Sequence, residues 1–134
     1  MDYKINSKEE ISKYVNHVYN NGYNKGLSTG IPWLDKHYTY RKGELDVITG
    51  FANIGKTTAI FYLMMLASVK YKWRWLCYCP ENEPVGEMVI DLAEMFIGMT
   101  ADKTKSERMD RSVFDAACEW VMKHFKVVSF PNTP

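Results

Sequence analysis

The sequence predicts an α/β fold with a mainly parallel sheet, and three observations lead to this prediction. Short apolar runs alternate with longer segments of helical periodicity, in the order strand, helix, strand, helix, helix, strand. A glycine-containing turn joins the first expected strand to the first long helix after it. The three expected strands make an incomplete sheet, because open parallel sheets normally have more strands and carry helices on both faces.

The composition is that of a globular domain with a core to bury. The 134 residues include 17 Lys+Arg and 16 Asp+Glu, a net charge of +1, and 46% are hydrophobic, which excludes wholesale disorder and favours one domain. The neutral balance provides no global field for nucleic acid. No apolar run could span a membrane and residues 1–10 are too polar for a signal peptide, so we expect a cytoplasmic protein without membrane partners. Cys77 and Cys79 are expected as buried thiols in a reducing compartment, and with Cys118 they show no zinc spacing.

A helix is expected over Ser7 to Asn20. Ser7 followed by Glu10 forms a capping box, and Gly22 and Gly26 end the helix. The apolar residues of this helix recur at helical spacing: Ile11, Tyr14, Val15, Val18 and Tyr19. This narrow stripe needs a partner surface.

A turn-rich segment at 27–43 precedes the alternating part of the chain. The apolar run 44–49, closed by Gly50, predicts a buried strand. The segment 57–70 is apolar almost all round, which is typical of a helix packed on a sheet face.

A second strand is expected at 74–79, where Pro80 stops it. Pro84 is suited to the first turn of a helix that ends near Gly98. A polar loop at 100–106 then leads to a helix over 110–124 and a third strand at 125–130.

The turn after the first expected strand carries the strongest chemical signal. Its residues fit the pattern G-x-x-x-x-G-K-[ST] at every fixed position: Gly50-Phe51-Ala52-Asn53-Ile54-Gly55-Lys56-Thr57. The two glycines let backbone N–H groups point inward at phosphate, and the following helix adds its positive N-terminal end. Lys56 can reach β- and γ-phosphates and the Thr57 hydroxyl can ligate Mg²⁺. A chance match is disfavoured because a strand is expected before the loop and a helix after it. We therefore expect residues 50–58, Thr58 included, to bind ATP or another nucleoside triphosphate.

Two carboxylates follow the second expected strand. Glu81 and Glu83 would lie at the strand ends, on the same side of the sheet as the phosphate-binding loop. One of them could activate the water that attacks the γ-phosphate, or both could simply favour the next helix through its dipole. Spacing alone does not choose between these roles or between the two glutamates.

A second cluster combines cations with aromatic residues in the link at 70–75. Such alternation is typical of single-stranded nucleic-acid binding, but lysine near a helix C-terminus is also favourable in itself. The structural interpretation is the stronger one, since the chain as a whole is neutral. His17, His37 and His124 are scattered and show no metal-ligand spacing.

Three blocks together resemble a known family. Thr29-Gly30 with Leu34-Asp35, then Gly43-Glu44-Leu45, then the loop at 50–57 are similar to the helicase domain of the DnaB and Twinkle group, ring-shaped replicative helicases to which many phage primase-helicases belong. The run Cys79 to Pro84 resembles the strand-end motif of that family, in which one glutamate activates water. The resemblance implies a RecA-like core at 27–134 after a linker helix and turn at 1–26, and it places the catalytic roles on Lys56 and Glu81.

The resemblance also implies partners. Members of the family form hexameric rings, hydrolyse nucleoside triphosphates with Mg²⁺ between subunits and move single-stranded DNA, which would place this chain in a bacterial or phage-infected cell. The Walker B strand, the DNA-binding loops and the arginine finger of the family have no counterpart before Pro134. We therefore expect almost no hydrolysis by the chain alone. A short regulatory protein that docks on a helicase ring, and a RecA-like recombinase or ATPase, remain as alternatives.

Overall fold

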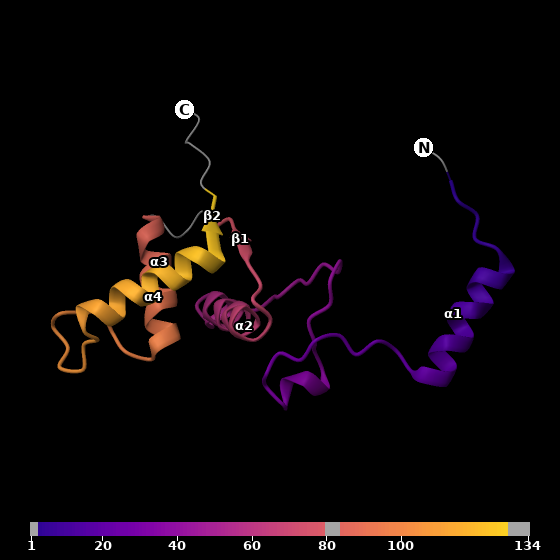
Figure 1. Ribbon diagram of the computed structural model, residues 1–134, viewed down its shortest axis with the longest axis horizontal. Coiled ribbons are helices and arrows are strands. Elements are labelled where there is room, and N and C mark those ends of the chain that lie inside the picture. Colours follow the sequence, from indigo (N-terminus) through magenta and orange to yellow (C-terminus); the bar gives the residue numbers. More distant parts are fainter. Residues whose placement is uncertain (1–2, 80–83, 129–134) are drawn as a thin grey trace. The chain divides into compact units, whose positions relative to one another are not determined.

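The computed structural model describes residues 3–79 and 84–128 and contains both helices and a parallel sheet (Figure 1). The chain divides into two compact units, Met1–Glu44 and Leu45–Pro134, which are considered separately. Its elements in chain order are α1 (Lys8–Asn21), a short 3₁₀ helix (Leu34–Lys36), α2 (Lys56–Tyr71), β1 (Trp75–Cys77), α3 (Val85–Ile97), α4 (Arg111–His124) and β2 (Phe125–Val127). This confirms the α/β class, whereas the predicted boundary between residues 26 and 27 stays a prediction.

The first helix forms as its capping residues predict. The Ser7 hydroxyl accepts a hydrogen bond from the Glu10 amide at 3.2 Å, and the Glu10 carboxylate accepts one from the Ser7 amide at 3.0 Å. The Ser7 amide, with a smaller contribution from the Lys4 ammonium, lowers the pKa of Glu10. No residue of α1 is buried, and of the predicted apolar stripe only Val18 is partly buried.

A carboxylate organises the turn-rich segment after α1. Asp35 accepts hydrogen bonds from the Ser28 hydroxyl at 2.6 Å, the Thr29 amide at 2.7 Å and the Thr29 hydroxyl at 2.6 Å. Thr29 is fully buried, and the Leu27 and Tyr40 backbones exchange two hydrogen bonds of 2.8 Å beside it. Residues 29–35, the first segment of the family resemblance, are therefore held together by the Asp35 hydrogen bonds, which we call the Asp35 clasp.

Asp35→Ala is expected to open this clasp at a cost of about 2–3 kcal/mol, because two hydroxyl groups and an amide lose a charged acceptor. Hydrogen exchange at the Thr29 amide measures the effect and should accelerate strongly. Glu44→Ala is the matched control, since it removes only an exposed ion pair with Arg41 and should cost about 0–0.5 kcal/mol. Equal exchange rates in the two variants would contradict the role given to Asp35.

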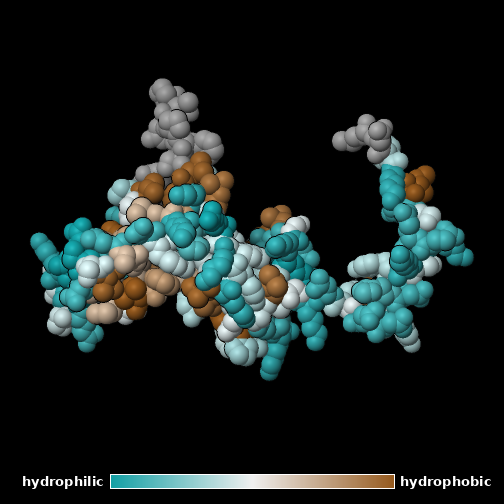
Figure 2. Space-filling view, viewed as in Figure 1, coloured by the Kyte–Doolittle hydropathy of each residue, from teal (hydrophilic) through white to brown (hydrophobic). Residues whose placement is uncertain are grey.

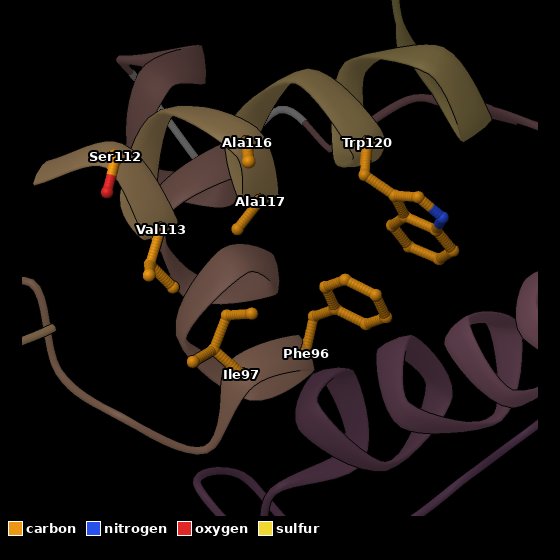
Figure 3. Close-up of a pocket in the computed structure, with 7 residues that line it drawn as sticks. All are labelled: Phe96, Ile97, Ser112, Val113, Ala116, Ala117 and Trp120. Atoms are coloured by element: carbon orange, nitrogen blue, oxygen red, sulfur yellow. The ribbon is translucent and has the colours of Figure 1, made fainter. Parts of the chain in front are cut away.

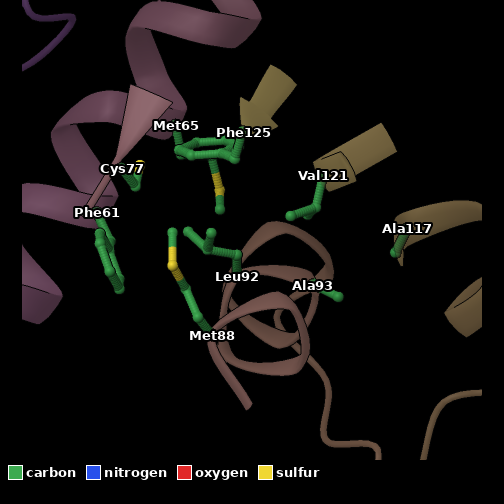
Figure 4. Close-up of a cluster of buried hydrophobic side chains, with 9 residues drawn as sticks. All are labelled: Phe61, Met65, Cys77, Met88, Leu92, Ala93, Ala117, Val121 and Phe125. Atoms are coloured by element: carbon green, nitrogen blue, oxygen red, sulfur yellow. The ribbon is translucent and has the colours of Figure 1, made fainter. Parts of the chain in front are cut away.

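The second unit is built on two strands joined through two helices. β1 and β2 pair in parallel, with Trp75 opposite Phe125 and Cys77 opposite Val127. α3 and α4 form the connection between them, as a parallel pair requires. Side chains from α2, both strands and both connecting helices meet in one core (Figure 4): Phe61, Met65, Cys77, Met88, Leu92, Ala93, Ala117, Val121 and Phe125.

The helices of this unit match their predictions closely. α2 covers the predicted segment 57–70 with one more residue at each end. α3 ends at Gly98, which adopts the left-handed conformation with φ 76°, and Pro84 is its N-cap instead of lying in its first turn. α4 begins at Arg111, one residue after the predicted start, with Asp110 as its N-cap, and ends at His124 as predicted. None of the helices in the described ranges has the length and apolarity needed to cross a membrane.

The strands are shorter than predicted, and the described residues of this unit cover only one face of the sheet. Trp75–Cys77 replaces the predicted 74–79, and Phe125–Val127 confirms the start of 125–130, of which 129–130 lie outside the described residues. Cys77 is buried, while Leu76 and Tyr78 on the other face are 76% and 57% exposed. Hydrophobic side chains accordingly reach the surface near the sheet (Figure 2).

The predicted buried strand at 44–49 is wrong. This segment is not paired with any described strand, and Leu45, Val47 and Ile48 are 89%, 75% and 51% exposed. A strand needs a neighbour to accept and donate its ladder hydrogen bonds, and the described strands β1 and β2 pair with each other instead. The apolar residues of 44–49 therefore lack the sheet hydrogen bonds that their pattern predicts.

The buried thiol of Cys77 should make the second unit sensitive to alkali. Burial, with a smaller contribution from Cys79, raises the pKa of Cys77 from 9.0 to about 11. The folded state then holds its proton where the unfolded state loses it, so this contribution to stability is complete below pH 9.0 and is lost as the pH rises to about 11. Urea unfolding across that range measures the loss. Cys77→Val, of similar volume, should lack this component, and identical pH profiles for the two proteins would contradict it.

Cys79 is only half-buried, so the predicted burial of both thiols holds fully for Cys77 alone, and all three cysteines are free.

Candidate functional site

The loop between residue 50 and α2 leads into a helix, as predicted, but within the described residues no strand precedes it. Gly55 is the N-cap of α2 and adopts the left-handed conformation, with φ 86° and ψ 23°. Asn53, two residues earlier, also has a positive φ, of 57°. Apart from glycine, asparagine is among the residues that best tolerate this conformation. The residue at position 53 is therefore explained by its backbone.

The side chain of Lys56 closes this loop. Its ammonium donates hydrogen bonds to the carbonyl oxygens of Gly50, at 3.0 Å, and Phe51, at 2.6 Å. A Cβ added to Gly50 would lie 3.4 Å from both Ile54 Cγ2 and Lys56 Cδ, which is van der Waals contact with the loop. An ammonium has three donors, and two are used within the loop, which leaves one for an incoming ligand.

The N-terminal end of α2 makes this region attractive to anions. The first turn of the 16-residue helix contains no acidic residue, and its first N–H groups have no partner within the helix. The sequence carries no Asp or Glu from residue 47 to residue 80. Backbone donors, the helix dipole and Lys56 thus act together on an anion at the loop.

The residues of the loop suit Mg²⁺ only when it arrives with phosphate. The described ranges hold no group of three or more His, Cys, Asp or Glu that could hold a metal ion. Thr57, in the first turn of α2, is exposed and can offer one hydroxyl oxygen. Mg²⁺ commonly takes one or two protein ligands together with phosphate oxygens and waters, and this arrangement fits that pattern.

The structure brings together the predicted residues 50–58 on one loop and helix start. The predicted catalytic carboxylate, Glu81, and its neighbour Glu83 lie outside the described residues. The sequence did not indicate that the carbonyl groups of Gly50 and Phe51 would hold the lysine. No residue type could signal it, since every residue carries a carbonyl, and only their positions before Lys56 make them reachable.

An apolar groove lies between α3 and α4 (Figure 3). It encloses about 380 Å³, and its walls include Trp120 and Phe96, whose rings stack with centroids 4.2 Å apart. The remaining lining residues are Ile97, Ser112, Val113, Ala116 and Ala117. Ser112 contributes the single hydroxyl and no charged residue lines the groove, so it offers apolar packing and no catalytic group.

Comparisons with protein-family models, with curated proteins and with solved structures found no match to this chain. The functional argument therefore rests on the residues and their geometry.

Proposed function

We propose that this chain is the nucleotide-binding part of a helicase of the DnaB and Twinkle type, with a RecA-like core, and that residues 50–58 bind the phosphates of ATP or another nucleoside triphosphate. The single observation that carries the proposal is the closed loop itself. Gly55 opens α2 in a left-handed conformation and Lys56 folds back on two loop carbonyls. The loop is thereby shaped around a lysine before any ligand arrives.

In this proposal each part of the loop has a separate task. Lys56 exchanges its carbonyl partners for β- and γ-phosphate oxygens, and the α2 N-terminus orients the phosphates through its N–H groups. Thr57 holds Mg²⁺, which neutralises phosphate charge when bound. Glu81, assigned by the family resemblance, would activate the attacking water.

The uncovered apolar surfaces support a core that further polypeptide completes. Leu45 and Val47 before the loop, and Leu76 and Tyr78 on the sheet, are each more than half exposed. In a hexameric ring acting on single-stranded DNA, the proposed parent assembly, additional strands would cover them. The same surfaces favour the second candidate, a short protein that docks on a helicase ring. A RecA-like recombinase or ATPase would use the loop in the same way.

Titration with a fluorescent ATP analogue in the presence of Mg²⁺ tests the proposal. We expect saturable binding that weakens when EDTA removes Mg²⁺, with almost no release of inorganic phosphate. Phosphoryl transfer depends on several positioned charges, and the described part of the loop supplies one lysine. Absence of nucleotide binding would reject the proposal. Rapid hydrolysis that Lys56→Ala abolishes would show that the chain has a complete active site.

A separate assay distinguishes the docking candidate. The chain is added to an intact ring helicase, and unwinding of a forked DNA is followed over time. Inhibition that persists in the Lys56→Ala variant favours a docking protein, whereas unchanged unwinding excludes that function for the helicase tested.

A further inference from the structure

Three aromatic rings are neighbours in the segment that joins α2 to β1. The ring centroids of Tyr71 and Trp73 are 6.2 Å apart, and those of Trp73 and Trp75 are 5.5 Å apart. Trp75 fixes one end of this series, because its indole N–H donates to the Met64 carbonyl at 3.1 Å and to the Ser68 hydroxyl at 2.9 Å. The series therefore begins at an anchored tryptophan and continues through Trp73 to Tyr71 at the end of α2.

Cationic side chains alternate with these rings along the chain. Lys70, Lys72 and Arg74 are all exposed, and the Lys70 ammonium lies 5.4 Å from the centroid of the Tyr71 ring. Within the described ranges, neither Lys72 nor Arg74 forms an ion pair with a carboxylate. Residues 47–80 contain no acidic residue, so this stretch of the sequence carries only positive charge even though the whole chain is nearly neutral.

The backbone at Lys72 shows that a lysine occupies a position better suited to glycine. Lys72 is the C-cap of α2 in the left-handed conformation, with φ 59° and ψ 30°. Glycine adopts this conformation without steric cost, whereas a lysine does so at a cost in stability. The Lys72 ammonium donates a hydrogen bond to the Val69 carbonyl at 3.1 Å. This bond is exposed, so it offsets only part of the cost of the left-handed backbone. The left-handed backbone and this hydrogen bond hold the Lys72 ammonium at the C-terminal end of α2, in the same segment as the aromatic rings.

We propose that residues 70–75 bind single-stranded nucleic acid, with bases stacking on Tyr71 and Trp73 and phosphates contacting Lys70, Lys72 and Arg74. Aromatic rings and cations in alternation match the alternation of base and phosphate along a single strand. A duplex hides the faces of its bases, so the same surface would hold it by charge alone. The proposal does not rest on nucleotide binding by residues 50–58.

Fluorescence anisotropy of a labelled oligothymidylate of about 20 nucleotides tests the proposal over about 50–200 mM salt. Lys72→Gly is the most informative variant, because it removes the charge and also relieves the left-handed strain, so weaker binding cannot be attributed to unfolding. Lys72→Gly and Arg74→Gln should each reduce the slope of log affinity against log salt by about 0.7. Trp73→Leu should weaken binding about tenfold through lost stacking. Lys103→Gln, an exposed lysine in a turn of the same unit, is the matched control and should bind as the unaltered chain does.

Several outcomes would overturn the proposal. These are no anisotropy change at the lowest salt, unchanged salt slopes in both Lys72→Gly and Arg74→Gln, or equal affinity for a duplex of the same length. Lys56→Ala should retain oligonucleotide binding. If Lys56→Ala lowered the affinity for the oligothymidylate as much as Lys72→Gly does, the binding site would include the phosphate-binding loop and the proposal for residues 70–75 would be rejected. Inorganic polyphosphate could also displace the oligothymidylate while Trp73→Leu binds it normally. That pair of results would mean that the segment binds any polyanion through charge, and it would contradict base stacking on Trp73.

Discussion

Lys56→Ala is expected to weaken the binding of Mg²⁺-nucleotide by about 10–100-fold. Hydrogen bonds from a charged donor contribute about 1.5–3 kcal/mol, which corresponds to this change in affinity. The lysine is well placed for the role, because it already lies over the loop on the carbonyl groups of Gly50 and Phe51. The measurement is the dissociation constant of a fluorescent ATP analogue with saturating Mg²⁺.

Two controls separate this effect from damage to the fold. Lys103→Ala, in a turn of the same unit, removes an equal charge and should leave affinity unchanged. The thermal unfolding midpoint of Lys56→Ala should stay close to that of the unaltered chain, since the contacts that it loses are exposed. Normal nucleotide affinity in Lys56→Ala would reject the proposed site, whatever the stability of the variant.

Local signals predicted the helices well. The Ser7–Glu10 capping box, the left-handed Gly98 and the apolar face of α3 are set within a few residues of each other along the chain. Helix hydrogen bonds connect residues four apart, so a short window of sequence contains most of the information. This is why predicted and observed helix boundaries agree within one or two residues.

The prediction of a strand at 44–49 was wrong because a strand, unlike a helix, depends on residues that are distant in sequence. Its apolar run meets the requirement for burial, but a strand is completed by a neighbour that can lie anywhere in sequence. β1 and β2 pair although α3 and α4 lie between them in sequence. The described residues contain no strand that pairs with the segment of Leu45 and Val47, and both side chains are exposed. A pattern in one segment cannot show whether its partner is present.

The candidate site was predicted as a set of residues but not as a geometry. The spacing of Gly50, Gly55 and Lys56 indicated phosphate binding because fixed glycines permit one loop shape. The same spacing leaves position 53 open to any residue, and the positive φ of Asn53 accounts for asparagine there only once the backbone is known. The role of Glu81 came from the family resemblance, and it stays a prediction because that residue lies outside the described ranges.

Leu92→Ala is expected to lower the free energy of unfolding of the second unit by about 2–5 kcal/mol. Leu92 is fully buried on α3 and lies in a core to which α2, α4 and both strands contribute (Figure 4). Removing its isobutyl group loses the transfer free energy and leaves a cavity that fixed elements on several sides cannot fill. Small domains have only about 5–15 kcal/mol of stability, so this single change could unfold much of the population.

Urea unfolding followed by tryptophan fluorescence measures the loss, because Trp75 and Trp120 both pack against this core. Ile90→Ala is the matched control on the same helix, since Ile90 is 38% exposed and should cost less than about 1 kcal/mol. Similar losses in the two variants would mean that the cluster around Leu92 does not hold the unit together. A large loss in Leu92→Ala alone would instead show that this core is closely packed even though one face of the sheet is uncovered. The exposure of Leu76 and Tyr78 would then not be a sign of a core that has failed to form.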